Sequence, residues 1–307
     1  MKRLTRQHLC SLQPSPDRKG LLHAPDPQLH VVQGESFCVE TYDAGHRLIL
    51  SKEDLTQPEG PMAGNPTTGP VYVENVHAGD VIAITIELLD VVGHTELETG
   101  VHSLLPEDVQ TERFDFIEIQ DGVANFPGGL RALMRPMFGT FGVIPMKLRP
   151  DPFTHGGNMD IPYVCQGSTI HLRCERDGGY FACGDGHALQ GDGEINAGSL
   201  EVSLDGILRI EKSPYQELKA ILIETDEQII TVGIQRDVRS SITEAVHAMS
   251  DLFARKQGVN LHEAYQFVSH VGDIRVGAIW PLWDSEDSVP IPFCLHLTRQ
   301  DFDQSVG

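Results

Sequence analysis

The chain has 307 residues, with 23 lysines and arginines against 44 aspartates and glutamates, which gives a formal net charge of -21. This charge opposes contact with phosphate backbones and anionic lipids, so we expect neither nucleic acid nor a membrane as a partner. No apolar run approaches the roughly 18 residues that suggest a membrane span. The six cysteines are scattered without a C-x-x-C pair, which favours reduced thiols and a cytoplasmic location.

Short strands and turns are predicted from about residue 29 to residue 235. Residues 81–88 alternate so that Ile82, Ile84 and Ile86 lie on one side of a strand. Four pairs of strands are expected to form hairpins: 114–119 with 123–126, 169–174 with 180–183, 200–204 with 207–210, and 221–224 with 229–234. The pattern predicts a mainly β fold whose antiparallel sheets form a sandwich-like or barrel-like body.

The pattern changes after about residue 238. Ser241 followed by Glu244 is typical of a capping box, and apolar residues at helical spacing predict a helix that ends at Gly258. Asn260 with Glu263 repeats this signal for a second helix over 261–270, and 274–280 resembles a strand. We therefore predict two units: a β-rich body over 1–237 and an α+β unit over 238–307 that docks on it.

The densest group of chemically active residues lies between 155 and 201. It comprises His155-Gly-Gly-Asn-Met-Asp160, Gly184-Asp-Gly-His187, Gly191-Asp-Gly-Glu194 and Glu201. The pairs Asp185/His187 and Asp192/Glu194 are spaced at i, i+2, which in extended backbone turns both members to one side. Clustered carboxylates repel one another unless a cation or a proton intervenes. The segment therefore predicts a metal site.

Carboxylate oxygens and imidazole nitrogens suit Zn²⁺, Mn²⁺ or Mg²⁺, whereas an all-oxygen subset would suit Ca²⁺. We expect a divalent metal, with Zn²⁺ preferred. The strongest candidate ligands are Asp160, His187, Asp192 and Glu194, followed by His155 and Asp185.

A catalytic metal site keeps one position for water and lowers the pKa of that water from near 16 towards about 7. A carboxylate must then carry the proton to the leaving group, and Glu201, with Asp185 as the second candidate, is predicted for this role. The Asn158 amide or the main-chain NH groups of Gly156 and Gly157 are predicted to bind the substrate and stabilise an oxyanion.

Simpler interpretations exist for parts of this block. Asp-Gly is a common turn dipeptide, although turn chemistry requires neither two histidines nor Glu194 and Glu201. Cys183 precedes Gly184, yet no neighbouring cation that would activate its thiol is evident from the sequence. No G-x-S-x-G elbow, phosphate-binding loop or dinucleotide fingerprint occurs, so nucleotide cofactors are not expected.

Taken together, the motifs resemble the acetamidase/formamidase family over about residues 30–280. The resemblance is carried by Thr68-Gly-Pro-Val-Tyr-Val-Glu74, Phe138-Gly-Thr-Phe-Gly-Val143, the block 155–160, the block 184–194 and Glu201. It implies a metal-containing hydrolase of short linear amides that releases ammonia and a carboxylate, with a β-rich fold and self-association, here expected as a homodimer.

Our principal hypothesis is therefore a metal-dependent amidohydrolase that acts on small amides of the formamide or acetamide type. A second hypothesis is a non-catalytic, metal-stabilised binding protein on the same scaffold, which would need no open coordination position. A third is a hydrolase or lyase that acts on another small substrate.

Overall fold

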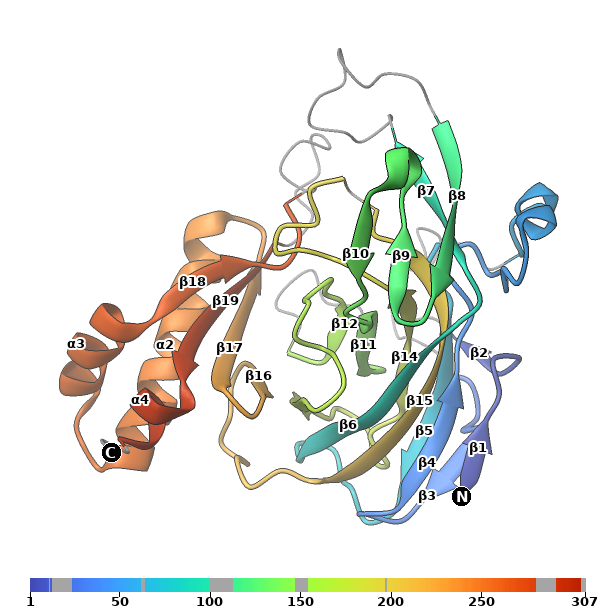
Figure 1. Ribbon diagram of the computed structural model, residues 1–307. Helices are drawn as coiled ribbons and strands as arrows, with labels where there is room; N and C mark the ends of the chain where they lie inside the picture. Colours follow the sequence, from blue (N-terminus) through green and yellow to red (C-terminus); the bar gives the residue numbers. More distant parts are fainter. Residues whose placement is uncertain are drawn as a thin grey trace.

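The computed structural model describes residues 1–10, 12, 24–61, 64–99, 113–146, 154–196, 198–279 and 291–304. Two sheets dominate it, one of fifteen strands and one of four (Figure 1). Apart from the pairs β1–β4 and β3–β5, the paired strands are antiparallel. The predicted fold class, mainly β with antiparallel sheets and a C-terminal α+β part, is confirmed. The sheets form an open, sandwich-like body and do not close into a barrel.

The large sheet has a main path and a side branch. Its main path contains, in spatial order, β12 (Gly156–Asn158), β11 (Met137–Val143), β14 (Phe181–His187), β15 (Glu201–Lys212), β6 (Val81–Val92), β13 (Thr169–Arg173), β16 (Ile221–Glu224), β17 (Gln228–Gln235), β19 (Ile291–Thr298) and β18 (Asp273–Val276). The branch contains β1 (Lys2–Leu4), β2 (Leu9–Cys10), β3 (Leu29–Val31), β4 (Ser36–Glu40) and β5 (Thr67–Val73).

The small sheet and two short 3-10 helices complete the β body. The small sheet contains β10 (Arg131–Leu133), β9 (Val123–Asn125), β8 (Arg113–Gln120) and β7 (Thr95–Thr99), and the 3-10 helices are η1 (Lys52–Thr56) and η2 (Pro127–Gly129). The hairpin predicted across Asp121-Gly122 is confirmed as β8–β9, and both turn residues have positive φ, at 50° and 76°. This is the geometry of a tight turn that matches the twist of its strands.

β14 lies where the body is most densely buried. All seven residues of β11 and all seven of β14 are buried, and β14 pairs with β11, β5 and β15. The rings of Phe138, Phe141 and Phe181 pack together, with centroids 5.8 Å and 4.8 Å apart for the successive pairs. Burial of such aromatic surface contributes strongly to stability and fixes the strands that carry the central motif.

Two of the predicted hairpins are wrong. Residues 201–212 form one strand, β15, because Asp205 and Gly206 pair with β4 on one side and with β6 on the other. The strand continues through this Asp-Gly pair without a turn, and its pairing with β6 shifts register between Ile207 and Leu208. β13 and β14 also do not pair with each other, since β13 joins β6 and β16. The pair β16–β17 forms as predicted.

Three helices follow the body: α2 (Val238–Gln257), α3 (Leu261–Val271) and α4 (Arg299–Asp303). α2 begins three residues before the predicted cap, because Asp237 accepts a hydrogen bond from the Ser240 NH. The Glu244 carboxylate instead accepts from the main-chain NH of Ile234, at 3.0 Å. The predicted end at Gly258, with φ at 68°, and the Asn260–Glu263 capping box of α3 are both observed.

The helices pack on one end of the large sheet (Figure 1). Strands β19 and β18 extend this sheet through β17, so strand pairing crosses the predicted boundary at residue 237. The division into two units stays a prediction. No helix among the described residues is long and apolar enough to span a membrane.

We predict that Asn260→Ala lowers the stability of the protein, because the Asn260 side chain accepts from the Glu263 NH at 3.0 Å and caps α3. The expected loss is about 1 kcal/mol, measured by urea unfolding. The control is Asn260→Asp, which keeps an acceptor oxygen at the cap and should remain close to the original chain. Equal stability of all three proteins would contradict this assignment of the cap.

Candidate metal and active site

The last residues of β14 bring Asp185 and His187 together. His187 Nε2 lies 3.6 Å from Asp185 Oδ1, and both side chains are buried. The predicted convergence of this pair is therefore observed, although the backbone is not regularly extended, since Asp185 has a φ of 57°. Left-handed backbone at a non-glycine residue is uncommon and concentrates at functional sites.

Asp160 reaches the same place from a different segment of the chain. Its main-chain NH donates to the Gly139 carbonyl of β11, at 3.2 Å. Potential ligand atoms of Asp160, Asp185 and His187 all lie within 4.8 Å of one another. Two of the four residues predicted as strongest ligands, Asp160 and His187, thus lie in one buried group. We call this group, together with Glu194 and Glu201, the acid–imidazole centre.

Gly139 makes room for this centre, and sequence reasoning gave it no role of its own. A Cβ atom at this position would lie 2.6 Å from Asp160 Oδ1, 2.7 Å from Asp185 Oδ2 and 2.9 Å from His187 Cε1. Such separations are far below van der Waals contact. The available signal was the motif Phe138-Gly-Thr140, but only the register of β11 against β14 shows why it contains glycine.

Gln190 fixes the orientation of the imidazole. Its Nε2 group donates to the carbonyls of Asp160, at 2.6 Å, and Gly277, at 3.3 Å, so its Oε1 atom accepts from His187 Nδ1 at 2.7 Å. Because Nδ1 carries the proton, Nε2 of the neutral ring presents a lone pair to the carboxylates. A lone pair facing carboxylates is unfavourable unless a proton or a metal ion lies between them.

Glu201 and Glu194 complete the centre on its other side. Potential ligand atoms of His187, Glu194 and Glu201 also lie within 4.8 Å of one another. Glu201 is the first residue of β15, pairs with His187 across the strands, and has its Oε1 atom 3.2 Å from His187 Nε2. The Ser199 hydroxyl lies 3.2 Å from both Glu194 Oε1 and Gln190 Oε1.

The electrostatics of the centre favour a cation. Burial raises the pKa of the Asp160 carboxyl well above its usual range, and the carboxylates of Glu194 and Asp185 raise it further. Burial likewise raises the pKa of Glu201, and raises that of Glu194 to about 7. Burial alone would lower the pKa of His187, but the nearby carboxylates of Glu201 and Asp185 raise it well above the ordinary value.

Two buried carboxylate oxygens of the centre lack a hydrogen-bond partner in the part of the chain that the structure describes, which favours a bound cation or proton. Asp160 Oδ1 and Glu201 Oε2 have no hydrogen-bond partner among the described residues. A buried carboxylate oxygen without a partner is costly, and a metal ion relieves that cost. The partnerless oxygens, the lone pair of His187 and the space left by Gly139 all suit a divalent ion held by oxygen and nitrogen donors.

The predicted convergence of Asp192 and Glu194 is wrong. Gly193 and Glu194 have positive φ, at 96° and 42°, so the segment turns and the two side chains diverge. The Glu194 side chain lies in the centre. The Asp192 Oδ2 atom instead accepts from the Tyr163 hydroxyl at 3.4 Å and lies 3.8 Å from Arg275 Nη1. Asp192 belongs to neither group of potential ligands.

His155, Gly156 and Gly157 lie beside β11 and form backbone contacts with it. His155 is buried and also lies outside both groups of potential ligands. Gly156 pairs with Gly142, and a Cβ on Gly156 would lie 2.2 Å from the Phe141 carbonyl oxygen, which explains the absence of a side chain there.

Asn158 is exposed but is linked to the centre. Its Oδ1 atom accepts from the Thr140 hydroxyl at 2.7 Å, and the same hydroxyl lies 3.1 Å from Asp185 Oδ2. Cys183 is fully buried, and burial raises the pKa of its thiol well above the ordinary value. A buried thiol of this kind is a poor nucleophile.

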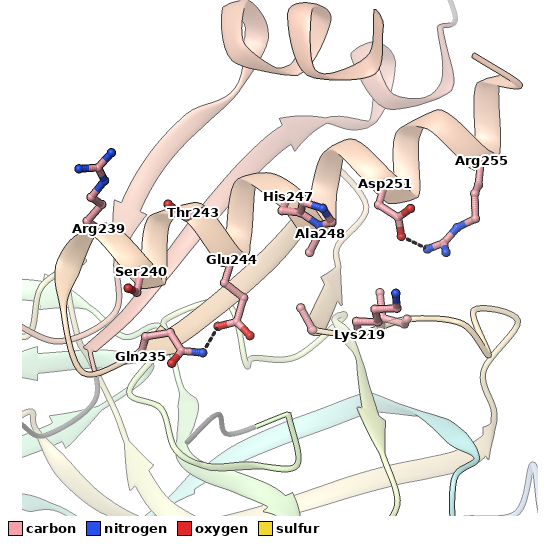
Figure 2. A pocket seen from close by; sticks show the side chains of 12 residues that line it. Lys219, Gln235, Arg239, Ser240, Thr243, Glu244, His247, Ala248, Asp251 and Arg255 are labelled. Atoms are coloured by element: carbon pink, nitrogen blue, oxygen red, sulfur yellow. Dashed lines mark hydrogen bonds and ion pairs between the residues drawn. The ribbon is translucent and has the colours of Figure 1, made fainter. Parts of the chain in front are cut away.

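Hollows on the described surface differ in their distance from the centre. One hollow, about 570 Å³, runs along α2, where Asp251 pairs with Arg255 and Glu244 accepts from Gln235 (Figure 2). None of its lining residues belongs to the acid–imidazole centre. A second, about 310 Å³, is lined by Gln190, Glu194 and Ser199 among others. A third, about 420 Å³, lies beside Tyr163 and Arg275.

Fold and site together define a β-rich protein with buried carboxylates around one imidazole, a donor set typical of hydrolases that use a divalent ion. Residues 148–269, in the central part of this chain, match the model of the acetamidase/formamidase family. Members of this family are enzymes that hydrolyse carbon–nitrogen bonds of amides, which confirms the predicted resemblance and enzyme class.

Solved structures share the whole fold. A predicted acetamidase/formamidase of Thermoanaerobacter tengcongensis has a TM-score of 0.84 and 25% identity, over 99% of this chain and 97% of that one. An acetamidase of Bacillus halodurans has a TM-score of 0.84 and 23% identity, over 99% of this chain and 100% of that one. An acetamidase of Yersinia enterocolitica has a TM-score of 0.79 and 23% identity, over 98% of this chain and 92% of that one. None of the curated proteins compared with the chain matches it.

We predict that Gly139→Ala weakens binding of a divalent ion at least tenfold, because the added methyl group would displace Asp160 and Asp185. Calorimetric titration with Zn²⁺ measures the affinity, and circular dichroism checks the fold. The matched control is Gly206→Ala in β15, where a Cβ would meet its neighbours at ordinary distances of 3.4 Å or more. Equal affinities of both variants would contradict the location of the site.

Proposed function

We propose that this protein is a metal-dependent amidohydrolase that cleaves short linear amides to ammonia and a carboxylate. The observation that carries the proposal is the buried centre in which Asp160, Asp185, His187, Glu194 and Glu201 form two groups of potential ligands that share His187 and include two partnerless carboxylate oxygens. The family domain supports the type of bond that is cleaved.

The residues suit Zn²⁺, since an imidazole contributes to both groups of potential ligands, with Mn²⁺, Mg²⁺ or Ca²⁺ as alternatives. Asp160, Asp185 and His187 would hold the ion, and Glu194 would adjoin it. This assigns Asp185 to the ion, in place of the catalytic role predicted from the sequence. When bound, the ion would polarise the amide carbonyl and lower the pKa of water.

Glu201 is proposed to move the proton. Its Oε1 atom accepts from the Ser199 NH at 3.3 Å and lies near His187, which leaves Oε2 to take a proton from the attacking water. The water oxygen then bonds to the carbonyl carbon, the carbon–nitrogen bond breaks, and Oε2 delivers the proton to the departing ammonia. The raised pKa of Glu201 suits a group that both accepts and donates a proton.

Asn158 is proposed to stabilise the oxyanion of the tetrahedral intermediate. The Thr140 hydroxyl donates a hydrogen bond to the Asn158 Oδ1 atom, which leaves the Asn158 Nδ2 group as a donor for the oxyanion. Main-chain NH groups of Gly156 and Gly157 are further candidates for this role. The homodimer and the cytoplasmic location predicted from the sequence stay predictions.

We predict that Glu201→Gln lowers the rate of ammonia release from acetamide by about 10² to 10⁴, because glutamine cannot carry the proton. Ammonia is measured after incubation with formamide, acetamide and propionamide. The control is Glu211→Gln, a change of the same kind on β15 at a residue that contacts Arg209. An unchanged rate in Glu201→Gln would remove this residue from the mechanism.

Removal of metal is expected to abolish ammonia release and to lower the melting temperature, since the carboxylates of the centre would then repel one another. Dialysis against a chelator followed by addition of Zn²⁺, Mn²⁺, Mg²⁺ or Ca²⁺ identifies the ion that restores both properties. Stoichiometric metal without turnover of any amide would favour the alternative of a metal-stabilised binding protein.

A further inference from the structure

The hollow beside the acid–imidazole centre, which we call the side pocket, is larger than a site for formamide or acetamide requires. Its volume is about 310 Å³. A water-sized group occupies roughly 30 Å³, so the side pocket corresponds to about ten such groups, against four non-hydrogen atoms in acetamide. Pockets of this size usually hold ligands much larger than acetamide.

Part of the lining of the side pocket is polar and adjoins the centre. Ser199, in its wall, lies 3.2 Å from both Glu194 and Gln190, and its main-chain NH donates to Glu201. Because Gln190 in turn orients His187, this wall contacts the groups that are proposed to act on the amide. An amide group placed at this wall would be next to the reacting residues.

Besides Asp192 and Asn196, the lining contains apolar residues from two different parts of the chain. Leu97 of β7 and Phe126, which follows β9, come from the small sheet, and Leu189, Ile195 and Leu200 come from the segment after β14. Leu97, Phe126 and Leu189 are only partly buried and pack with one face against the main core. Ile195 is 61% exposed. An apolar ligand would cover this surface and gain free energy from its burial.

We infer that the side pocket binds the acyl group of the substrate, and that the preferred substrates are primary amides with an unbranched apolar acyl chain of about four to six carbons. This inference rests on the proposed function. It assigns the apolar wall to the hydrocarbon chain and the Ser199 wall to the amide group. Each methylene that enters the side pocket should raise kcat/KM about fourfold, which corresponds to its burial free energy.

The test is a series of amides from acetamide to hexanamide, with kcat/KM measured by ammonia release from the full chain. We expect hexanamide, which has four more methylenes, to exceed acetamide by roughly 250-fold. A flat or falling series, with acetamide still turned over, would overturn the inference and leave the proposed function intact. Faster cleavage of N-butylacetamide, measured by release of butylamine, than of hexanamide would overturn the assignment to the acyl side. No ammonia from any amide would overturn the proposed function and this inference with it.

A variant pair tests the location. Gly198 lines the side pocket, its φ is not in the left-handed region, and a Cβ there would meet nothing within 4 Å. Gly198→Leu should therefore fill the space and lower the ratio of kcat/KM for hexanamide to that for acetamide at least tenfold. Gly198→Ala, which adds little volume, should keep most of this ratio. Retention of the ratio in Gly198→Leu would overturn the location.

Discussion

The structure around β14 depends on one constraint: four carboxylates and an imidazole must share a buried space. Each carboxylate taken from water loses hydration, and each destabilises its charged neighbours. The protein meets part of this cost with fixed partners, since Gln190 holds the imidazole and Thr140 contacts Asp185. Asp160 Oδ1 and Glu201 Oε2 keep no such partner among the described residues, so the arrangement is most stable with a bound cation.

The antiparallel sheet is what makes this arrangement achievable. The centre takes its residues from segments that are far apart in sequence, and the pairing of β11, β14 and β15 sets their separation. A shift of register by one residue would turn His187 and Glu201 to opposite faces. The packed rings of Phe138, Phe141 and Phe181 hold this register, so the site depends on the aromatic core beside it.

Sequence patterns predicted what depends on local chemistry. The hairpin at Asp121-Gly122 and the caps at Gly258 and Asn260 follow from backbone preferences of single residues. Asp185 and His187 converge as their spacing predicted, although Asp185 has left-handed and not extended backbone. Features set by distant strands were not predictable in this way. Asp205-Gly206 lies within a strand because both its neighbours are strands. The divergence of Asp192 from Glu194 has a local cause instead, since positive φ at Gly193 and Glu194 turns the chain.

The shared imidazole has a consequence for stoichiometry. His187 belongs to both groups of potential ligands, and its Nδ1 atom is already engaged by Gln190. Only one nitrogen lone pair is left, and a lone pair forms one coordinate bond. The two groups therefore cannot each hold their own imidazole-bound ion at the same time: any second ion would have oxygen donors alone, and would be of a harder kind than the first.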